Sequence, residues 1–159
     1  ALAPVDLAAW VRQVAADLAP QALARSQLLS VDAPQTPCLV QGDATLLSVM
    51  LRNLLDNAIR YSPSGGQVEV RLTADVQGVR CAVQDTGPGL DDAALARLGE
   101  RFFRVLGSGE SGSGLGWSIV RRVAALHGAK VTARRAEAAG GLLAEVWFPP
   151  LPPLPLNCS

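Results

Sequence analysis

The segment from Ala44 to Tyr61 constrains the fold most, because its pattern predicts a long helix with one apolar face. Asp43 precedes it as a suitable N-cap, and Ser62-Pro63-Ser64-Gly65-Gly66 ends it. A helix of this kind needs a second layer of structure to cover its apolar face. The apolar positions recur at helical three- and four-residue spacing: Leu47, Met50, Leu51, Leu54, Leu55 and Ala58.

The rest of the chain shows further helical and strand patterns. Helices are expected at about 7–24, 91–98 and 115–127, the first capped by Asp6 and the last stopped by Gly128. In the first helix, Trp10, Val14, Leu18 and Leu23 are expected to point inward. Strands are expected at 28–31, 38–41, 67–74, 78–84, 130–135 and 142–148, the last four as two hairpins.

This order predicts an α+β fold, a two-layer α/β sandwich. One mixed, mostly antiparallel sheet would be covered on one face by three helices. With 159 residues, 49% of them hydrophobic, the chain suits one domain with a substantial core. We expect this domain at residues 1–149 and a proline-rich, disordered tail at 150–159.

Charge and cysteine content exclude several classes of function. The formal net charge is +0, so bulk electrostatics favours neither nucleic acid nor direct contact with an anionic membrane. No apolar run approaches the roughly 20 residues of a membrane span. The three cysteines are widely separated, which indicates a reducing compartment and no cysteine metal site.

Polar side chains on the 44–61 helix form the first candidate site. Asn53 and Asn57 are one turn apart and share a face, and Arg60 and Tyr61 extend it. A carboxamide oxygen can ligate Mg²⁺ and an Arg can hold phosphate, although an ordinary solvated helix face would have the same pattern.

Two glycine-containing segments add further candidates. Asp85-Thr86-Gly87-Pro88-Gly89 follows a strand, where a carboxylate could accept a hydrogen bond from an exocyclic amine while the backbone packs on a flat ring. Taken alone, the same residues could form a simple turn. Gly112-Ser113-Gly114-Leu115-Gly116 opens a helix, whose free N–H groups favour phosphate.

These segments follow one another along the chain in a set order: the asparagine helix, then Asp85–Gly89, then Glu100-Arg101-Phe102-Phe103-Arg104, then Gly112–Gly116. In this respect the chain resembles the catalytic ATP-binding domain of bacterial sensor histidine kinases, whose superfamily includes gyrase, mismatch-repair ATPases and heat-shock chaperone ATPases. The resemblance covers about 4–149. It implies an ATP-binding domain with Mg²⁺ and a flexible ATP lid at 105–113.

The resemblance also implies roles for individual residues. Asn57 would ligate Mg²⁺ with Asn53 in support, Arg60 would contact phosphate, and Tyr61 would line the nucleotide. Asp85 would bind the adenine amino group. The remaining implied residues are Gly87 and Gly89 at the base, Phe102 and Phe103 anchoring the lid, Arg101 or Arg104 reaching the terminal phosphate, and Gly112, Ser113, Gly114, Leu115 and Gly116 around the phosphates.

Three positions qualify the resemblance. Hydrolysing members of the superfamily have a Glu that activates water where this chain has Asn53, and an amide cannot act as a base near neutral pH. This favours phosphoryl transfer over hydrolysis. Trp117 stands where leucine is commoner, and we expect it to pack under the lid. His127 is expected to act as a cation suited to the C-terminal dipole of its helix rather than as a phosphoacceptor.

The implied partners lie outside this chain. The phosphoacceptor histidine of the family is on a separate dimerisation domain, so the chain is expected to bind ATP without autophosphorylating alone and to serve a relay to a response regulator. It would be a cytoplasmic domain of a protein in the bacterial inner membrane. The alternatives are an ATP hydrolase or nucleotide switch of the same superfamily, and a non-catalytic nucleotide-sensing or partner-binding module.

Overall fold

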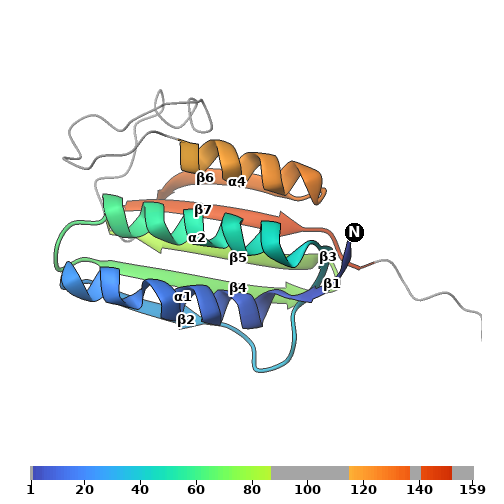
Figure 1. The fold of residues 1–159 in the computed structure, drawn as a ribbon, viewed down its shortest axis with the longest axis horizontal. Coiled ribbons are helices and arrows are strands. Elements are labelled where there is room, and N and C mark those ends of the chain that lie inside the picture. The colour runs from blue at the N-terminus through green and yellow to red at the C-terminus, as the bar shows by residue number, and fades with distance from the viewer. Residues whose placement is uncertain (1, 87–114, 137–140, 152–159) are drawn as a thin grey trace, which may run out of the picture.

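The computed structural model describes residues 2–86, 115–136 and 141–151 (Figure 1). Its elements, in chain order, are β1 (Ala3–Asp6), α1 (Leu7–Ala24), β2 (Leu28–Asp32), β3 (Leu39–Gly42), α2 (Ala44–Tyr61), β4 (Gln67–Asp75), β5 (Gly78–Asp85), α4 (Leu115–Leu126), β6 (Lys130–Ala136) and β7 (Gly141–Phe148). The expected helix at 91–98 and the expected lid lie outside the described residues.

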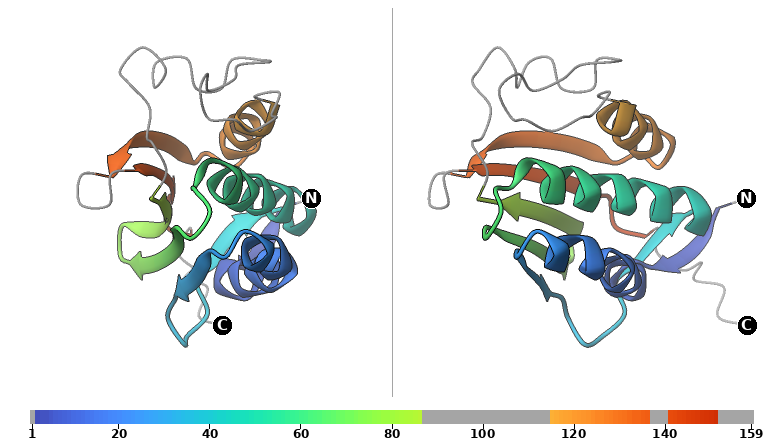
Figure 2. Two further views of the ribbon diagram at one scale, coloured as in Figure 1. Left: turned by 90° about the vertical axis from the view of Figure 1, so that its left-hand side faces the viewer. Right: turned by 60° about the vertical axis from the view of Figure 1, so that its left-hand side comes forward.

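A five-stranded sheet forms one layer of the fold. Its strand order is β2-β4-β5-β7-β6, with β2 and β4 parallel and the other neighbours antiparallel. The three described helices lie together on one side of this sheet (Figure 2). The predicted α+β sandwich with a mixed, mostly antiparallel sheet is therefore confirmed, as are the hairpins β4–β5 and β6–β7.

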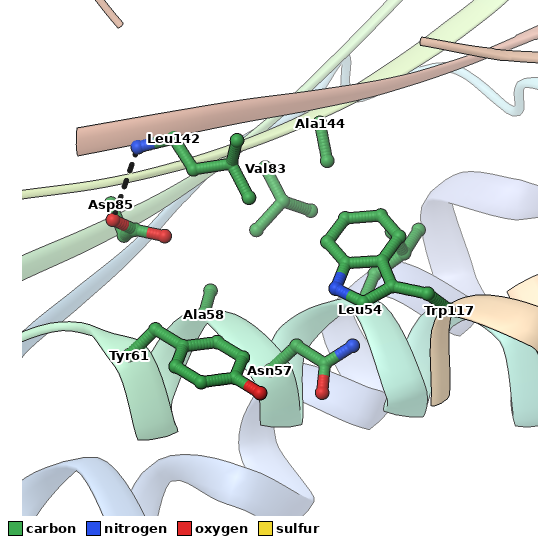
Figure 3. A pocket seen from close by; sticks show the side chains of 9 residues that line it. All are labelled: Leu54, Asn57, Ala58, Tyr61, Val83, Asp85, Trp117, Leu142 and Ala144. Carbon is green, nitrogen blue, oxygen red and sulfur yellow. Dashed lines mark hydrogen bonds between the residues drawn. The ribbon is translucent and has the colours of Figure 1, made fainter. Parts of the chain in front are cut away.

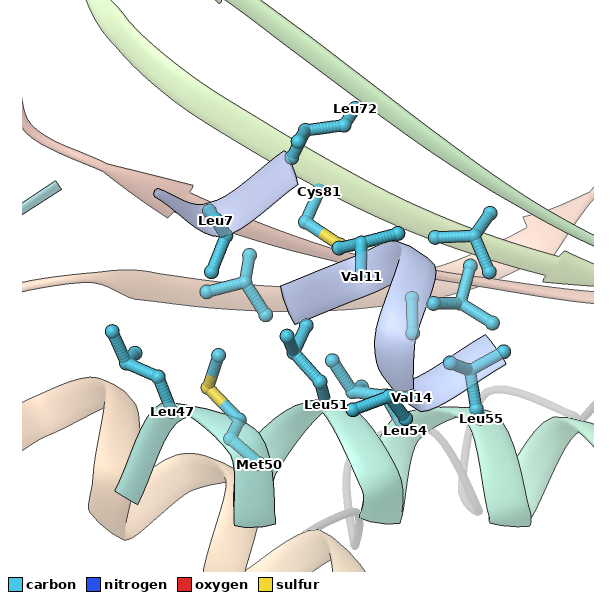
Figure 4. Close-up of a cluster of buried hydrophobic side chains, with 14 of the residues drawn as sticks. Leu7, Val11, Val14, Leu47, Met50, Leu51, Leu54, Leu55, Leu72 and Cys81 are labelled. Atoms are coloured by element: carbon cyan, nitrogen blue, oxygen red, sulfur yellow. The ribbon is translucent and has the colours of Figure 1, made fainter. Parts of the chain in front are cut away.

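Alternation along the strands places the core between the sheet and the helices. In β5, for example, Val79, Cys81 and Val83 are buried while Arg80 is exposed. The helix α2 adds its apolar face to this core, and side chains of α1 pack beside it against the sheet (Figure 4). The buried positions of α2 are Leu47, Met50, Leu51, Leu54, Leu55, Ala58 and Ile59.

Side-chain caps fix the starts of the two long helices where the sequence predicted them. An oxygen of Asp6 accepts a hydrogen bond from the Ala8 amide at 3.1 Å, and an oxygen of Asp43 accepts one from the Leu46 amide at 3.0 Å. Each cap satisfies an amide that has no partner within the helix.

The C-terminal end of α2 is held by the connection between α1 and β2. The Gln27 amide donates to the carbonyls of Ile59 at 2.9 Å and Ser62 at 3.0 Å. The Arg25 guanidinium also donates to the Ser62 carbonyl, at 2.9 Å. These donors satisfy carbonyls at the helix end, which would otherwise need water or another partner. The end of α2 is therefore fixed by residues more than 30 positions earlier.

Two details of the predicted layers were wrong. The strand candidates at 28–31 and 38–41 lie in different sheets: β2 pairs with β4, whereas β3 pairs with β1 in a separate two-stranded sheet. Their connection is held against α1, where Arg12 donates to the Pro34 carbonyl at 2.7 Å. Leu23 is 76% exposed, because Ala22 and Leu18 supply the buried face of the last turns of α1.

The prediction that His127 is a cation was also wrong. The His127 ring is buried, and its two nitrogens have opposite hydrogen-bonding roles. Nδ1 lies 2.7 Å from the Val123 carbonyl, which can only accept, and Nε2 lies 3.1 Å from the Asp43 amide nitrogen, which can only donate. This pattern requires a neutral ring with its proton on Nδ1. His127 therefore joins the end of α4 to the start of α2.

The buried thiol of Cys81 gives a prediction about stability at alkaline pH. Burial raises the pKa of this thiol to about 12, whereas an unfolded chain would release the proton near about 8.5. The native state then binds more protons than the unfolded state between these two values. The free energy of unfolding should be unaffected by this group below about pH 8.5 and fall above it, by at most about 1.4 kcal/mol per pH unit.

Urea unfolding of the wild type and of Cys81→Ala from pH 7 to 11 would measure this effect as a difference, which cancels the titration of other groups. The variant should lose stability less steeply above pH 9. Parallel curves for the two proteins would contradict a buried, protonated thiol.

Candidate functional site

A pocket opens between the C-terminal half of α2, the first turn of α4 and the adjoining ends of β5 and β7 (Figure 3). The space between its walls is about 220 Å³, including solvent at its open mouth. The lining residues are Leu54, Asn57, Ala58, Tyr61, Val83, Asp85, Trp117, Leu142 and Ala144.

Asp85 brings a carboxylate to one end of this pocket. It is the last residue of β5 and is only 3% exposed. One of its oxygens accepts a hydrogen bond from the Leu142 backbone amide at 3.2 Å. The other oxygen points into the pocket (Figure 3). A buried carboxylate held in this way is an acceptor of fixed direction, suited to an N–H donor on a bound ring.

Asn53 and Asn57 both lie against the start of α4. A Cβ placed on Gly116 would be 3.1 Å from Oδ1 of Asn53 and 3.0 Å from Nδ2 of Asn57. Asn53 donates from its own Nδ2 to the Val49 carbonyl at 2.8 Å, which holds its oxygen in place. The structure thus brings together two predicted segments, the asparagine helix and the second glycine segment, at one point.

The amide nitrogen of Asn57 is buried and has no hydrogen-bond partner among the described residues. Leaving such a donor without an acceptor costs free energy, so this position favours a bound group that can accept a hydrogen bond. It sits on the pocket wall between Tyr61 and Trp117 (Figure 3).

The remaining walls of the pocket are mainly apolar. Val83 and Ala144 come from the sheet, Leu54 and Ala58 from α2, and the indole of Trp117 closes the end opposite Asp85 (Figure 3). An apolar slot with a carboxylate at one end and carboxamides at the side suits a flat heteroaromatic ring that carries an amino group.

Arg60 lies on the last turn of α2, about half exposed. Its Nε forms an ion pair with Asp56, four residues earlier, at 3.1 Å. An exposed pair of this kind is weak, so the guanidinium can exchange partners at little cost.

Several predicted site residues lie outside the described residues. Leu115 begins α4, but the structure describes only its backbone. The predicted residues of which nothing is described are Gly87, Gly89, Arg101, Phe102, Phe103, Arg104, Gly112, Ser113 and Gly114.

Sequence reasoning did not identify the apolar residues that line the pocket, and three of the missed residues have a specific role. Trp117 was expected only to pack under the lid, but it lines the pocket itself. Leu142 lines the pocket and binds Asp85, and Gly141 adjoins Asp85 so closely that a Cβ would be 2.5 Å from Oδ1. The position of Trp117, just after the second glycine segment, could have identified it. Leu142 and Gly141 gave no signal, because their role depends on the pairing of β5 with β7.

Comparisons with known proteins agree with this geometry. A family model described as "Histidine kinase-, DNA gyrase B-, and HSP90-like ATPase" matches residues 42–152. The sensor protein QseC of Escherichia coli K12 is 54% identical over 99 residues, which are 62% of this chain and 21% of QseC. The chain thus spans about a fifth of the length of this relative.

Solved structures give the same result for the fold. The mycobacterial sensor histidine kinase MprB has a TM-score of 0.81 and 30% identity, covering 94% of this chain and 97% of that one. Full-length ShkA in complex with AMPPNP has a TM-score of 0.76 and 33% identity, covering 93% of this chain and 30% of that one. Among the described residues, no helix is long and apolar enough to cross a membrane.

Proposed function

The chain belongs to the family of histidine kinase-, DNA gyrase B- and HSP90-like ATPases, and on this basis we propose that it is the ATP-binding catalytic domain of a sensor histidine kinase. In this role it would hold ATP while the γ-phosphoryl group passes to a histidine of a separate domain. The bond from phosphorus to the bridging oxygen breaks as the bond to the ring nitrogen forms, and ADP leaves.

The pocket would hold the adenine of ATP. Its apolar walls match a flat ring, and the inward oxygen of Asp85 would accept a hydrogen bond from the exocyclic amine. Tyr61 would line the nucleotide, as the sequence predicts, and Trp117 would close the far wall. AMPPNP, which is bound in the related structure of ShkA, is an ATP analogue and contains the same base.

The phosphates would lie where the asparagines meet the start of α4. The free N–H groups of a helix start attract phosphate, and Gly116 leaves the space that a side chain would fill. Gly112, Ser113, Gly114 and Leu115 precede it in sequence and would belong to the same cradle, and Arg60 and one of Arg101 and Arg104 would supply positive charge.

The donor set also fits Mg²⁺. Among the described residues there is no group of three His, Cys, Asp or Glu side chains that could hold a metal, but Mg²⁺ bound with phosphates needs only one or two protein ligands and keeps several waters. The Asn57 oxygen would be the protein ligand, with Asn53 in support. The ion would neutralise charge on the phosphates.

Asn53 favours transfer over hydrolysis. Its Nδ2 is engaged by the Val49 carbonyl, and an amide cannot remove a proton from water near neutral pH. With no base at position 53, catalysis would depend on positioning the phosphates and neutralising their charge. The acceptor would be the dimerisation and phosphoacceptor domain of the same kinase, which would pass the phosphoryl group to a response regulator. We place the domain in the cytoplasm and the whole kinase in the bacterial inner membrane.

The single observation that carries this proposal is the buried Nδ2 of Asn57 beside the pocket, which has no hydrogen-bond partner among the described residues. Titration calorimetry of the chain with ATP should show binding in Mg²⁺ and much weaker binding in EDTA. A phosphate-release assay on the same sample should detect no turnover, and phosphoryl transfer should require an added phosphoacceptor domain. Absence of ATP binding in Mg²⁺ would contradict the proposal, and steady phosphate release would favour a hydrolase.

A further inference from the structure

We propose that the backbone amide of Leu142 determines which atom position 85 presents to the bound base, so that the Gly141–Leu142 segment sets base specificity. This inference rests on the proposed function, because it assumes that a nucleotide base occupies the pocket. It adds positioning residues from β7 to the site.

The end of the β5–β7 ladder provides the first argument. The last paired residues of these antiparallel strands are Gln84 and Leu143. One position further, the Leu142 amide donates to the Asp85 side chain at 3.2 Å. The carboxylate therefore accepts a hydrogen bond from β7 just beyond the last paired residues, and the strand sets its orientation.

Gly141 provides the second argument. A Cβ on this residue would overlap the Asp85 carbonyl oxygen and lie 2.5 Å from its Oδ1. The start of β7 can therefore lie against Asp85 only when position 141 has no side chain. Glycine at position 141 is therefore required for the close approach that allows the Leu142 hydrogen bond.

The third argument concerns how the Leu142 amide would orient an asparagine side chain at position 85. A carboxylate has two acceptor oxygens, so it presents an acceptor to the pocket in either orientation. An asparagine has one oxygen and one NH₂. The Leu142 N–H can be paired only by the oxygen, which leaves the NH₂ directed into the pocket. Because the site is buried, the reverse orientation would leave two donors facing each other without water.

It follows that Asp85→Asn should reverse the base preference rather than merely weaken it. Adenine offers an amino donor where guanine offers a carbonyl acceptor. The wild type should favour ATP over GTP by about tenfold to several-hundred-fold, since one mismatched buried polar contact is worth this much. Asp85→Asn should favour GTP, by roughly tenfold.

The experiment is calorimetric titration of Mg-ATP and Mg-GTP into the wild type, Asp85→Asn, and the matched surface variant Asp32→Asn. Asp32 is exposed on β2, so its variant should retain the wild-type ratio. A fourth protein combines Asp85→Asn with Gly141→Ala, which moves β7 away from position 85 and should return the ratio towards one. Melting curves verify that each variant is folded.

Each outcome has a separate meaning. A preference for GTP in Asp85→Asn supports the inference. A ratio near one in that variant means that the amide rotates freely, which overturns the inference while the base contact stands. A ratio equal to that of the wild type removes Asp85 from base recognition and overturns the inference. Failure of the wild type to bind ATP overturns the proposed function itself.

Hydrogen exchange on the wild type tests the inference without any variant. The Leu142 amide, which donates to the Asp85 side chain, should be as strongly protected as that of Ala144 in the nucleotide-free protein. Fast exchange at Leu142 beside slow exchange at Ala144 would overturn the proposed restraint.

Discussion

Asn57→Ala is expected to abolish Mg²⁺-dependent ATP binding while leaving the fold intact. The substitution removes the proposed metal ligand and the buried amide on the pocket wall. Losing hydrogen bonds to a charged group costs about 1.5–3 kcal/mol, and losing the metal contact adds to this. We therefore expect affinity to fall by more than about 100-fold.

The stability of the ligand-free variant separates this expectation from a structural role for Asn57. Its Nδ2 has no partner among the described residues, so removing it leaves no broken bond and releases a desolvation cost. The melting temperature without ATP should stay the same or rise, whereas the stabilisation caused by ATP should disappear. Asn53→Ala should reduce affinity less, because Asn53 is proposed only to support the ligand.

Arg52→Ala, on the same helix, is the control. Arg52 is exposed and pairs with Asp17 at 2.9 Å, away from the pocket. Its variant should bind ATP as the wild type does. Unchanged ATP affinity in Asn57→Ala, or a lower melting temperature without ATP, would remove Asn57 from the proposed site.

Leu51→Ala should cause the largest loss of stability, about 2–5 kcal/mol in the free energy of unfolding. The Leu51 side chain is 1% exposed and points from α2 into the core that it shares with Val11 and Val14 of α1 (Figure 4). Truncation loses the transfer free energy of the removed carbons and leaves a cavity, and together these give the stated cost.

Leu46→Ala is a matched control, because it makes the same chemical change on the same helix. Leu46 is 36% exposed, so its truncation should cost about 1 kcal/mol or less. Urea unfolding of both variants measures the difference. Equal costs at the two positions would mean that α2 does not bury the face that the structure assigns to it.

Much of this fold follows from local patterns in the sequence. The spacing of apolar residues in α2 and alternation in β4 and β5 gave elements of the right type and extent, since each signal is contained in a few consecutive residues. The proximity of Asn53 and Asn57 follows from helical periodicity alone. The resemblance to a known family supplied the link between these residues and Asp85.

Other features depended on contacts between distant segments. The separation of β2 from β3 requires partners in β4 and β1, which neither strand specifies by itself. The neutral ring of His127 depends on the Asp43 amide, 84 positions away. Gly141 and Leu142 acquire their role only when β7 pairs with β5. In each case the partner lies far away in the sequence and could not be identified from the local pattern.

Gln27 and Arg25 donate hydrogen bonds to the end of α2, so they limit how far the domain can be shortened from its N-terminus. The family match begins at residue 42, after both residues and after the whole of α1. A shorter chain starting there would retain every proposed nucleotide ligand, yet lose the donors to Ile59 and Ser62 and the helix that covers part of the core. The first 41 residues therefore support the pocket through α2 although none of them lines it, and a chain cut to residues 42–152 should be less stable than the whole domain.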